Sequence, residues 1–379
     1  AYVPIPHADL EFVQLIVRHG DRTPYVTLSH DNATWRCDTS NSPHSASLQS
    51  SPGDGPSEEH RCSPGDLTNR GKAQLRRLGA QLHEVYVDRL GFLPKALDRP
   101  EAVYFRATHV PRTQESGRNL LRGLWPEGSG KAADGVPVHV LPQELETMFD
   151  NPNICPNVYS YATQIRNSRP YTTFLKDQAE FMNRLIAIFG VSGDKWLSNW
   201  SGYVDVLWSR HCHNMALPCM WQAVNTTAAC ASVEDAKQAM RNAHFEWTLK
   251  YRDHLLSTQY LRCAIGAFLG TLHEQIQDHI AGKIQGLRLA LYSAHDSTVA
   301  AILGAFKASN RDILWPPYAA NIAIELWKNL GGNRVVRVMY NGQALLLQEG
   351  QQWCDLGACP IDIYGAHLKH YIPANITAQ

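Results

Sequence analysis

The sequence lacks a net charge, a membrane-length apolar run and paired cysteine blocks. Lysine plus arginine and aspartate plus glutamate both number 35, so no global charge would attract nucleic acid or an anionic membrane. No apolar run approaches the ~20 residues that span a bilayer. The nine cysteines form no C-x-x-C blocks of zinc spacing. We therefore expect a globular protein with no nucleic-acid partner, no membrane span in this chain and no metal.

The sequons and cysteines that are present favour an oxidising compartment. Four N-glycosylation sequons begin at Asn32, Asn199, Asn225 and Asn375. The sequence allows a disulfide that closes a small loop between Cys354 and Cys359, and a second disulfide between Cys37 and Cys62 that closes the long loop between them. The first residues, AYVPIPHADLEF, carry no leader pattern, and we interpret them as a mature start. We expect an N-glycosylated protein that is secreted or lies in the secretory or lysosomal lumen.

The periodicity alternates strands and helices at both ends of the chain. Strands are expected at 10–17 and 102–107, with helices after each, and Thr68 or Asn69 as the first cap. Residues 145–280 are mostly helical by period, and strands return at 287–295, 321–328 and 335–340. Asn341-Gly342 predicts a type I′ hairpin. We expect an α/β fold with a central, mostly parallel sheet flanked by helices, formed by 1–140 and 265–379, with an inserted α-helical cap at 141–264.

Charged side chains follow the expected strands where each strand ends. Arg18, His19 and Arg22 follow the first strand, Arg106 ends the second, and His295 and Asp296 end a late strand. Ligands of open α/β sheets bind beyond the carboxyl ends of the strands. Three guanidiniums suit a tetrahedral phosphate dianion, and a neutral imidazole among them can attack phosphorus. A protonated Asp296 could then give a proton to the leaving alkoxide.

Each of these residues also has an ordinary structural interpretation. A single arginine at a strand end is usually solvated surface, and Asp296 could simply cap the following helix. Asp21 is expected to face outward or to pair with an arginine, without a catalytic role. The coincidence at three strand ends favours a functional site over these readings.

Three segments resemble the histidine acid phosphatases. RHGDRTP is similar to their RHGxRxP signature, SAHD to their second motif, and FRATHVPRT to the stretch with their third phosphate-binding arginine. The resemblance implies a phosphoglycerate mutase-like fold, no metal, no cofactor and a homodimer. It also implies roles for six residues: His19 as nucleophile, Asp296 as proton donor, and Arg18, Arg22, Arg106 and His295 as phosphate ligands.

A second segment gives a narrower resemblance. SRHCHNMALPC, residues 209–219, is similar to a cap segment of the family and looks most like the 2-phosphoxylose phosphatase group. It makes His213 a candidate substrate contact. For the His-Cys-His run at 211–213 we favour a structural disulfide over a metal site.

The function expected from these observations is acid phosphatase activity on a small-molecule or glycan phosphate monoester, through a phosphohistidine. An acidic optimum follows if Asp296 must be protonated in the complex. The alternatives are a non-catalytic phosphate- or glycan-binding homologue, or a specialised phosphatase for 2-phosphoxylose, phytate or lysophosphatidate. The sequons, the cysteines and the large cap argue against a cytosolic sugar-phosphate mutase.

Overall fold

The computed structural model describes residues 2–28, 33, 35, 37, 62–126, 133–193, 196–197, 199–220, 230–284, 286–309 and 315–374. The sequons at Asn32, Asn225 and Asn375 and the Ser- and Pro-rich stretch near 39–57 lie outside these residues. Among the helices within these ranges, none combines the length and the apolar character needed to cross a bilayer.

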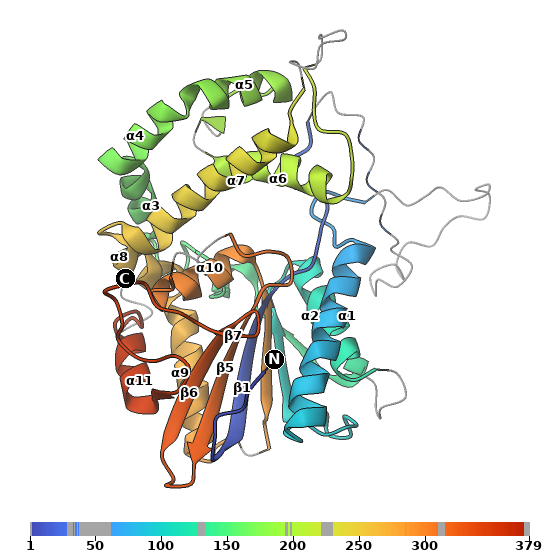
Figure 1. The fold of residues 1–379 in the computed structure, drawn as a ribbon, viewed down its shortest axis with the longest axis vertical. Helices are drawn as coiled ribbons and strands as arrows, with labels where there is room; N and C mark the ends of the chain where they lie inside the picture. The colour runs from blue at the N-terminus through green and yellow to red at the C-terminus, as the bar shows by residue number, and fades with distance from the viewer. Residues whose placement is uncertain are drawn as a thin grey trace, which may run out of the picture.

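One mixed sheet forms the centre of the molecule, in the order β3-β2-β4-β1-β5-β6-β7, with β8 paired to β6. The parallel half pairs β2 with β3 and β4, and β4 with β1, whereas β5 to β8 pair antiparallel. The bounds are β1 Ala8–Arg18, β2 Val103–Ala107, β3 Val138–Val140, β4 Leu289–Ala294, β5 Asn321–Asn329, β6 Arg334–Tyr340, β7 Gln343–Ala344 and β8 Cys359–Pro360. The predicted α/β class with a sheet between helices is confirmed (Figure 1). The sheet is mixed rather than mostly parallel as predicted, because no helix lies between β5, β6 and β7 in the chain and these strands pair antiparallel.

The two faces of the sheet bury different residues of the same strands. In β1, Val13, Leu15 and Val17 belong to the hydrophobic cluster under α1 and α2, Asn69–His83 and Pro111–Leu124. Phe12 and Ile16 belong to the cluster that includes residues of α9, α10 and α11, Gly266–Ile280, Asp296–Ala305 and Ile361–Lys369. This alternation follows from the two-residue period of a strand, and burial on both faces explains why residues 12–17 are apolar apart from Gln14, whose amide donates to the Leu272 carbonyl.

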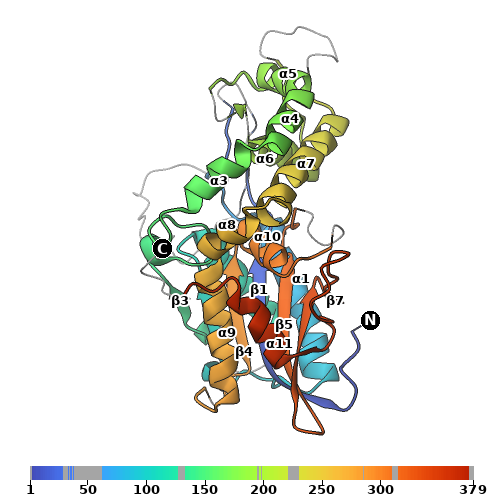
Figure 2. The ribbon, with the colours of Figure 1, turned by 90° about the vertical axis from the view of Figure 1, so that its left-hand side faces the viewer.

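An upper helical layer, α3 to α7, lies above the end of the sheet where β1, β2 and β4 finish (Figures 1 and 2). Its helices are α3 Val158–Arg166, α4 Arg169–Asp177, α5 Ala179–Phe189, α6 Trp200–Cys212 and α7 Val233–Thr248. Residues of α5, α6 and α7 form a third hydrophobic cluster around Trp200 and Tyr203. The helix α8, Ser257–Ala264, instead shares the cluster of α9.

Local signals in the sequence predict several details of the structure. Thr68 caps α1 by accepting the Gly71 N–H, and Asn341 and Gly342 both have positive φ, 48° and 78°, as a type I′ turn requires. The disulfides Cys37–Cys62 and Cys354–Cys359 are present, together with Cys155–Cys263 and Cys219–Cys230. Short 3₁₀ helices at 100–102, 133–135 and 143–145 and π-helical turns at 84–89 and 249–253 complete the described elements.

Candidate active site

The turn after β1 packs its backbone directly against the start of α1. A Cβ added to Gly20 would lie 2.4 Å from the Gly71 carbonyl oxygen, so no side chain fits there. The Gly20 N–H donates to Ser116 Oγ at 3.1 Å, and the Thr68 N–H donates to the Asp21 carbonyl at 3.0 Å. These contacts explain the glycine of RHGDRTP and fix the direction of the residues on either side of it.

His19 is buried, with 1% of its surface exposed, and its protonation state follows from its contacts. Its Nδ1 lies 2.8 Å from the Gly20 carbonyl oxygen, which can only accept. Nδ1 therefore carries the hydrogen, and Nε2 keeps a lone pair. Burial, followed by the nearby cations Arg112, Arg18 and Arg22, holds the pKa of His19 well below its usual 6.5. The imidazole is thus neutral and nucleophilic even in mildly acidic solution.

His295 comes from the end of β4 and lies across from His19, with ring centroids 5.7 Å apart. Its Nδ1 is 3.3 Å from Arg112 Nη2, which can only donate, and its Nε2 is 3.0 Å from Thr108 Oγ1. Burial, followed by Arg112, lowers the pKa of His295 to about 3. His295 is therefore a neutral ring.

Asp296 is the first residue of α10 and forms an ion pair with Arg18, Oδ2 to Nη2, at 2.8 Å. Burial alone would raise the pKa of this carboxyl, but Arg18, Arg22 and His295 outweigh it and the pKa is lowered. Without a bound anion, Asp296 is a carboxylate.

Arg22 is held from the upper helical layer. Its Nη1 donates to Asp205 Oδ1 of α6 at 2.7 Å, and the other Asp205 oxygen accepts the N–H groups of Tyr25 and Val26 at 2.6 and 3.0 Å. The Nε–H groups of Arg18, Arg22 and Arg112 are buried and have no hydrogen-bond partner in the described part of the chain; the same is true of Arg106. Unused buried donors of the first three, around two neutral imidazoles, form a cradle for an anion.

Arg106 does not lie where we expected it. Its Nη2 is 2.7 Å from Glu146 Oε1, and its guanidinium lies 5.9 Å from the ring of Phe268 on α9. Arg106 therefore points to the α9 face of the sheet, whereas its neighbours Phe105 and Ala107 belong to the α1–α2 face. The phosphate-ligand role predicted for Arg106 is corrected accordingly: the arginine of this segment that reaches the histidines is Arg112, in the first turn of α2.

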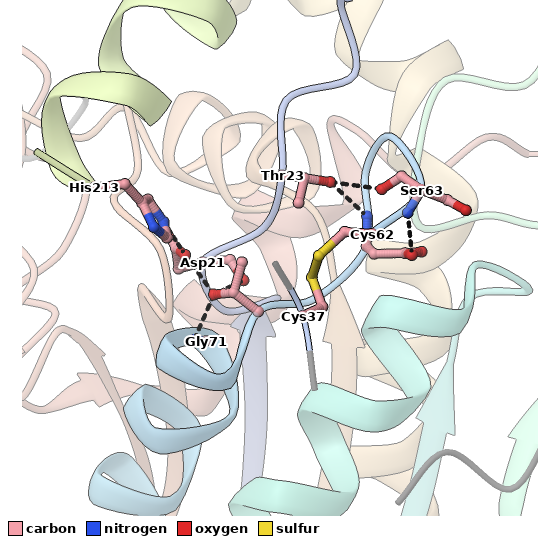
Figure 3. Close-up of a disulfide and its surroundings, with 9 residues drawn as sticks. Asp21, Thr23, Cys37, Cys62, Ser63, Gly71 and His213 are labelled. Carbon is pink, nitrogen blue, oxygen red and sulfur yellow. Dashed lines mark hydrogen bonds and ion pairs between the residues drawn. A yellow bond between two sulfur atoms is a disulfide. The ribbon is translucent and has the colours of Figure 1, made fainter. Parts of the chain in front are cut away.

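His213 also has a different partner from the predicted one. Figure 3 shows its ring pointing at Asp21, with Nε2 to Oδ2 at 2.6 Å. The same Asp21 oxygen accepts the Thr68 hydroxyl at 2.5 Å. Asp21, which we expected to face outward or to pair with an arginine, is instead buried and connects the start of α1 with the end of α6. Cys212, for which we favoured a disulfide, is a free thiol.

A cavity of about 910 Å³ opens above Arg18, Arg22 and Asp296. Its walls come from α6, from α7 and from the segment that begins at Trp315. Asp205, Arg112 and these wall residues were missed from the sequence. The Pro-Arg-Thr triplet at residues 111–113, which begins α2, was the feature of the sequence that could have identified Arg112.

Comparison with known proteins agrees with this fold. The family model described as histidine phosphatase superfamily (branch 2) matches residues 9–341. Counting factor 60 of Dictyostelium discoideum is 28% identical over 94% of this chain and 84% of its own length. Lysosomal acid phosphatase of Xenopus laevis is 26% identical over 90% of this chain and 72% of its own length. 2-phosphoxylose phosphatase 1 of Xenopus tropicalis is 27% identical over 90% of this chain and 70% of its own length.

Among solved structures, Hafnia alvei phytase in complex with tartrate superposes with a TM-score of 0.69 at 16% identity, covering 99% of this chain and 100% of the phytase. This likeness shows a shared fold. The family match covers well over half of the sequence, including both the segment of His19 and that of His295. The chain therefore belongs to branch 2 of the histidine phosphatase superfamily.

Proposed function

We propose that this protein hydrolyses phosphate monoesters through a phosphohistidine formed on His19. The observation that carries the proposal is the tautomer of His19: Nδ1 is tied to the Gly20 carbonyl, and Nε2 keeps its lone pair among three arginines. A neutral imidazole surrounded by guanidiniums has no ordinary structural purpose, because the cations oppose its protonation and leave it reactive toward an electrophile.

The proposed cradle consists of Arg18, Arg22 and Arg112, with the neutral ring of His295 beside them and its N–H shared with Thr108. A phosphate monoester carries roughly −2 charge near neutral pH, and three guanidiniums offset it. Their planar donors suit the equatorial oxygens of a transferring phosphoryl group and stabilise its charge. The Nε–H groups without partners are the donors that such an anion would satisfy.

The reaction balances with Asp296 as proton donor. His19 Nε2 forms a bond to phosphorus while the P–O bond to the alcohol breaks, and the leaving oxygen takes the Asp296 proton. Water then attacks phosphorus, its proton goes to the Asp296 carboxylate, and the N–P bond breaks to release phosphate. A bound dianion raises the pKa of Asp296, which Arg18 and Arg22 lower in the free protein, so activity should be highest in acid.

The compartment belongs to the proposal as well. Four disulfides within the described residues, and similarity to a protein named lysosomal acid phosphatase, support a secretory or lysosomal location. There the protein would act on a small-molecule or glycan monoester, with residues 141–264 as the cap that shapes the substrate pocket.

The test is His19→Ala with nitrophenyl phosphate at pH ~4–6, a range set by the usual carboxyl and imidazole pKa values. We expect loss of turnover and loss of an acid-labile phosphoenzyme trapped by rapid quench. His370→Ala, which changes an exposed histidine after α11, is the matched control and should keep both. A wild-type protein that binds phosphate but releases no nitrophenol would favour the non-catalytic alternative.

A further inference from the structure

The walls of the cavity above the cradle differ in chemistry from its floor. The floor carries Arg18, Arg22 and Asp296. The walls carry large apolar side chains from separate segments: Tyr25, Val26, Val204, Trp208, Met240, Trp247, Trp315, Tyr318 and Tyr340. A phosphate seated on the floor would direct its ester oxygen and its alcohol toward these walls.

Two of the three tryptophans in the wall are packed against each other. Trp247 of α7 stacks on Trp315 with centroids 4.2 Å apart and an interplanar angle of 22°. Trp247 Nε1 also donates to Ser201 Oγ at 3.2 Å, so the polar atom of this indole already has a protein partner. Trp208 of α6 is half-buried and contacts the ring of His211. Flat, pre-positioned rings bind apolar groups at little cost in conformational entropy.

Several side-chain acceptors on the wall already have protein partners. Asp205 uses both oxygens on Arg22 and on two backbone N–H groups. The side-chain oxygen of Asn199 accepts the Gly202 N–H, and that of Asn341 accepts the Asn321 N–H. The acceptors that are already used cannot serve a polyhydroxylated alcohol, whose hydroxyls would also lose hydrogen bonds to water against the apolar rings of the wall.

The wall also carries little charge for a second phosphate. Above the floor, Arg241 is the one arginine among the lining residues that the structure describes, and these include no lysine. Arg241 is paired with Glu234 at 3.0 Å. Burial, then the neighbouring Arg252, lowers the pKa of His244 and so disfavours a positive charge on this wall residue. Beyond its first phosphate, a polyanion would meet a single arginine on the wall, and that arginine already shares its charge with Glu234.

From these observations we infer that the enzyme selects monophosphates whose leaving alcohol is apolar and uncharged, through an aromatic wall in which Trp208 contacts the alcohol. This inference rests on the proposed phosphatase activity. An aromatic alcohol and an alkyl-chain alcohol are both apolar and uncharged. The experiment therefore includes a substrate of each kind, to show which of the two alcohols the wall selects.

The experiment measures kcat/KM for naphthyl, dodecyl and glycerol phosphates and for inositol hexakisphosphate. Dodecyl and glycerol phosphates have leaving groups of similar basicity, so their ratio reports the wall rather than the chemistry of P–O cleavage. We expect the wild-type protein to prefer the apolar esters. Trp208→Ala should lower kcat/KM for them roughly tenfold and change glycerol phosphate by less than about twofold. Trp208→Phe should restore most of the preference.

Trp353→Ala is the control, because Trp353 stacks on His367 at 3.7 Å outside this cavity; it should leave the substrate ratios unchanged. Equal loss on all esters in Trp208→Ala, or a wild-type preference for glycerol phosphate or the hexakisphosphate, would overturn the inference. Absence of turnover on every ester would instead refute the proposed function. If Trp208→Ala lowers kcat/KM for naphthyl phosphate alone, the wall selects an aromatic alcohol. If it lowers kcat/KM for dodecyl phosphate alone, the wall selects an alkyl-chain alcohol.

Discussion

Exchanging Arg112 and Arg106 for methionine, one at a time, tests which arginine serves the cradle. Arg112 Nη2 lies 3.3 Å from His295 Nδ1, whereas Arg106 Nη2 lies 2.7 Å from Glu146 Oε1. The two arginines lie near each other in sequence but face different partners. We expect Arg112→Met to damage phosphate binding and Arg106→Met to damage stability.

The magnitudes follow from what each substitution leaves behind. Each charge-assisted hydrogen bond contributes about 1.5–3 kcal/mol, so losing one guanidinium should weaken inhibition by inorganic phosphate about a hundredfold. Burial, and then repulsion by Arg22, lowers the pKa of Arg112, so its removal should cost less than about 1 kcal/mol of folding free energy.

Arg106→Met instead leaves the fully buried carboxylate of Glu146 without its positively charged partner. Removing one partner of a buried pair costs about 3–5 kcal/mol. The N–H groups of Thr147 and Met148 still donate to Glu146 at 2.8 Å, so the lower end of this range applies. Urea unfolding and the inhibition constant for phosphate measure the two effects. A hundredfold loss of phosphate affinity in Arg106→Met at unchanged stability, with Arg112→Met near wild type, would refute the reasoning.

Three further predictions follow from the same site. The free energy of unfolding should fall as pH drops below 6.5, because the neutral His19 and His295 cannot take up the protons that the unfolded chain binds. The loss is roughly 2 kcal/mol for each by pH 5, and urea midpoints equal at pH 7 and 5 would contradict it. Asp296→Asn should keep phosphate affinity but slow an alkyl ester far more than nitrophenyl phosphate in steady-state assays, and equal slowing would argue against a proton donor. Gly20→Ala should lower the thermal midpoint and the activity together, by roughly 2 kcal/mol or more in stability, because its Cβ meets the Gly71 carbonyl; an unchanged midpoint would contradict that packing.

The secondary structure was largely predictable because its signals are local. The apolar run of β1, the cap at Thr68 and the turn at Asn341-Gly342 each depend on a few neighbouring residues. The free thiol of Cys212 was not predictable, because pairing depends on which cysteines the tertiary structure brings together.

Within the candidate site, the sequence identified the residues that end β1 and β4 and missed the one that begins α2. A strand end offers two directions, toward one face of the sheet or beyond its edge, and sequence position alone does not choose between them. Arg106 alternates with Phe105 and Ala107, so once those two are assigned to the α1–α2 face, Arg106 must face α9. The same alternation, applied to the sequence, would have argued against Arg106 as a phosphate ligand and left Arg112 as the next arginine of the segment.

The contacts of α6 were beyond sequence reasoning, and they change how the site is understood. Asp205 on this helix holds Arg22, and His213 just after it holds Asp21, so α6 holds the RHGDRTP turn at two points. Trp208, between them, forms part of the cavity wall. One helix therefore both orients a proposed phosphate ligand and carries the residue proposed to contact the alcohol. A substitution that displaces α6 as a whole should therefore change phosphate affinity and substrate preference together, whereas Trp208→Ala, which only truncates one wall side chain, should change the preference alone.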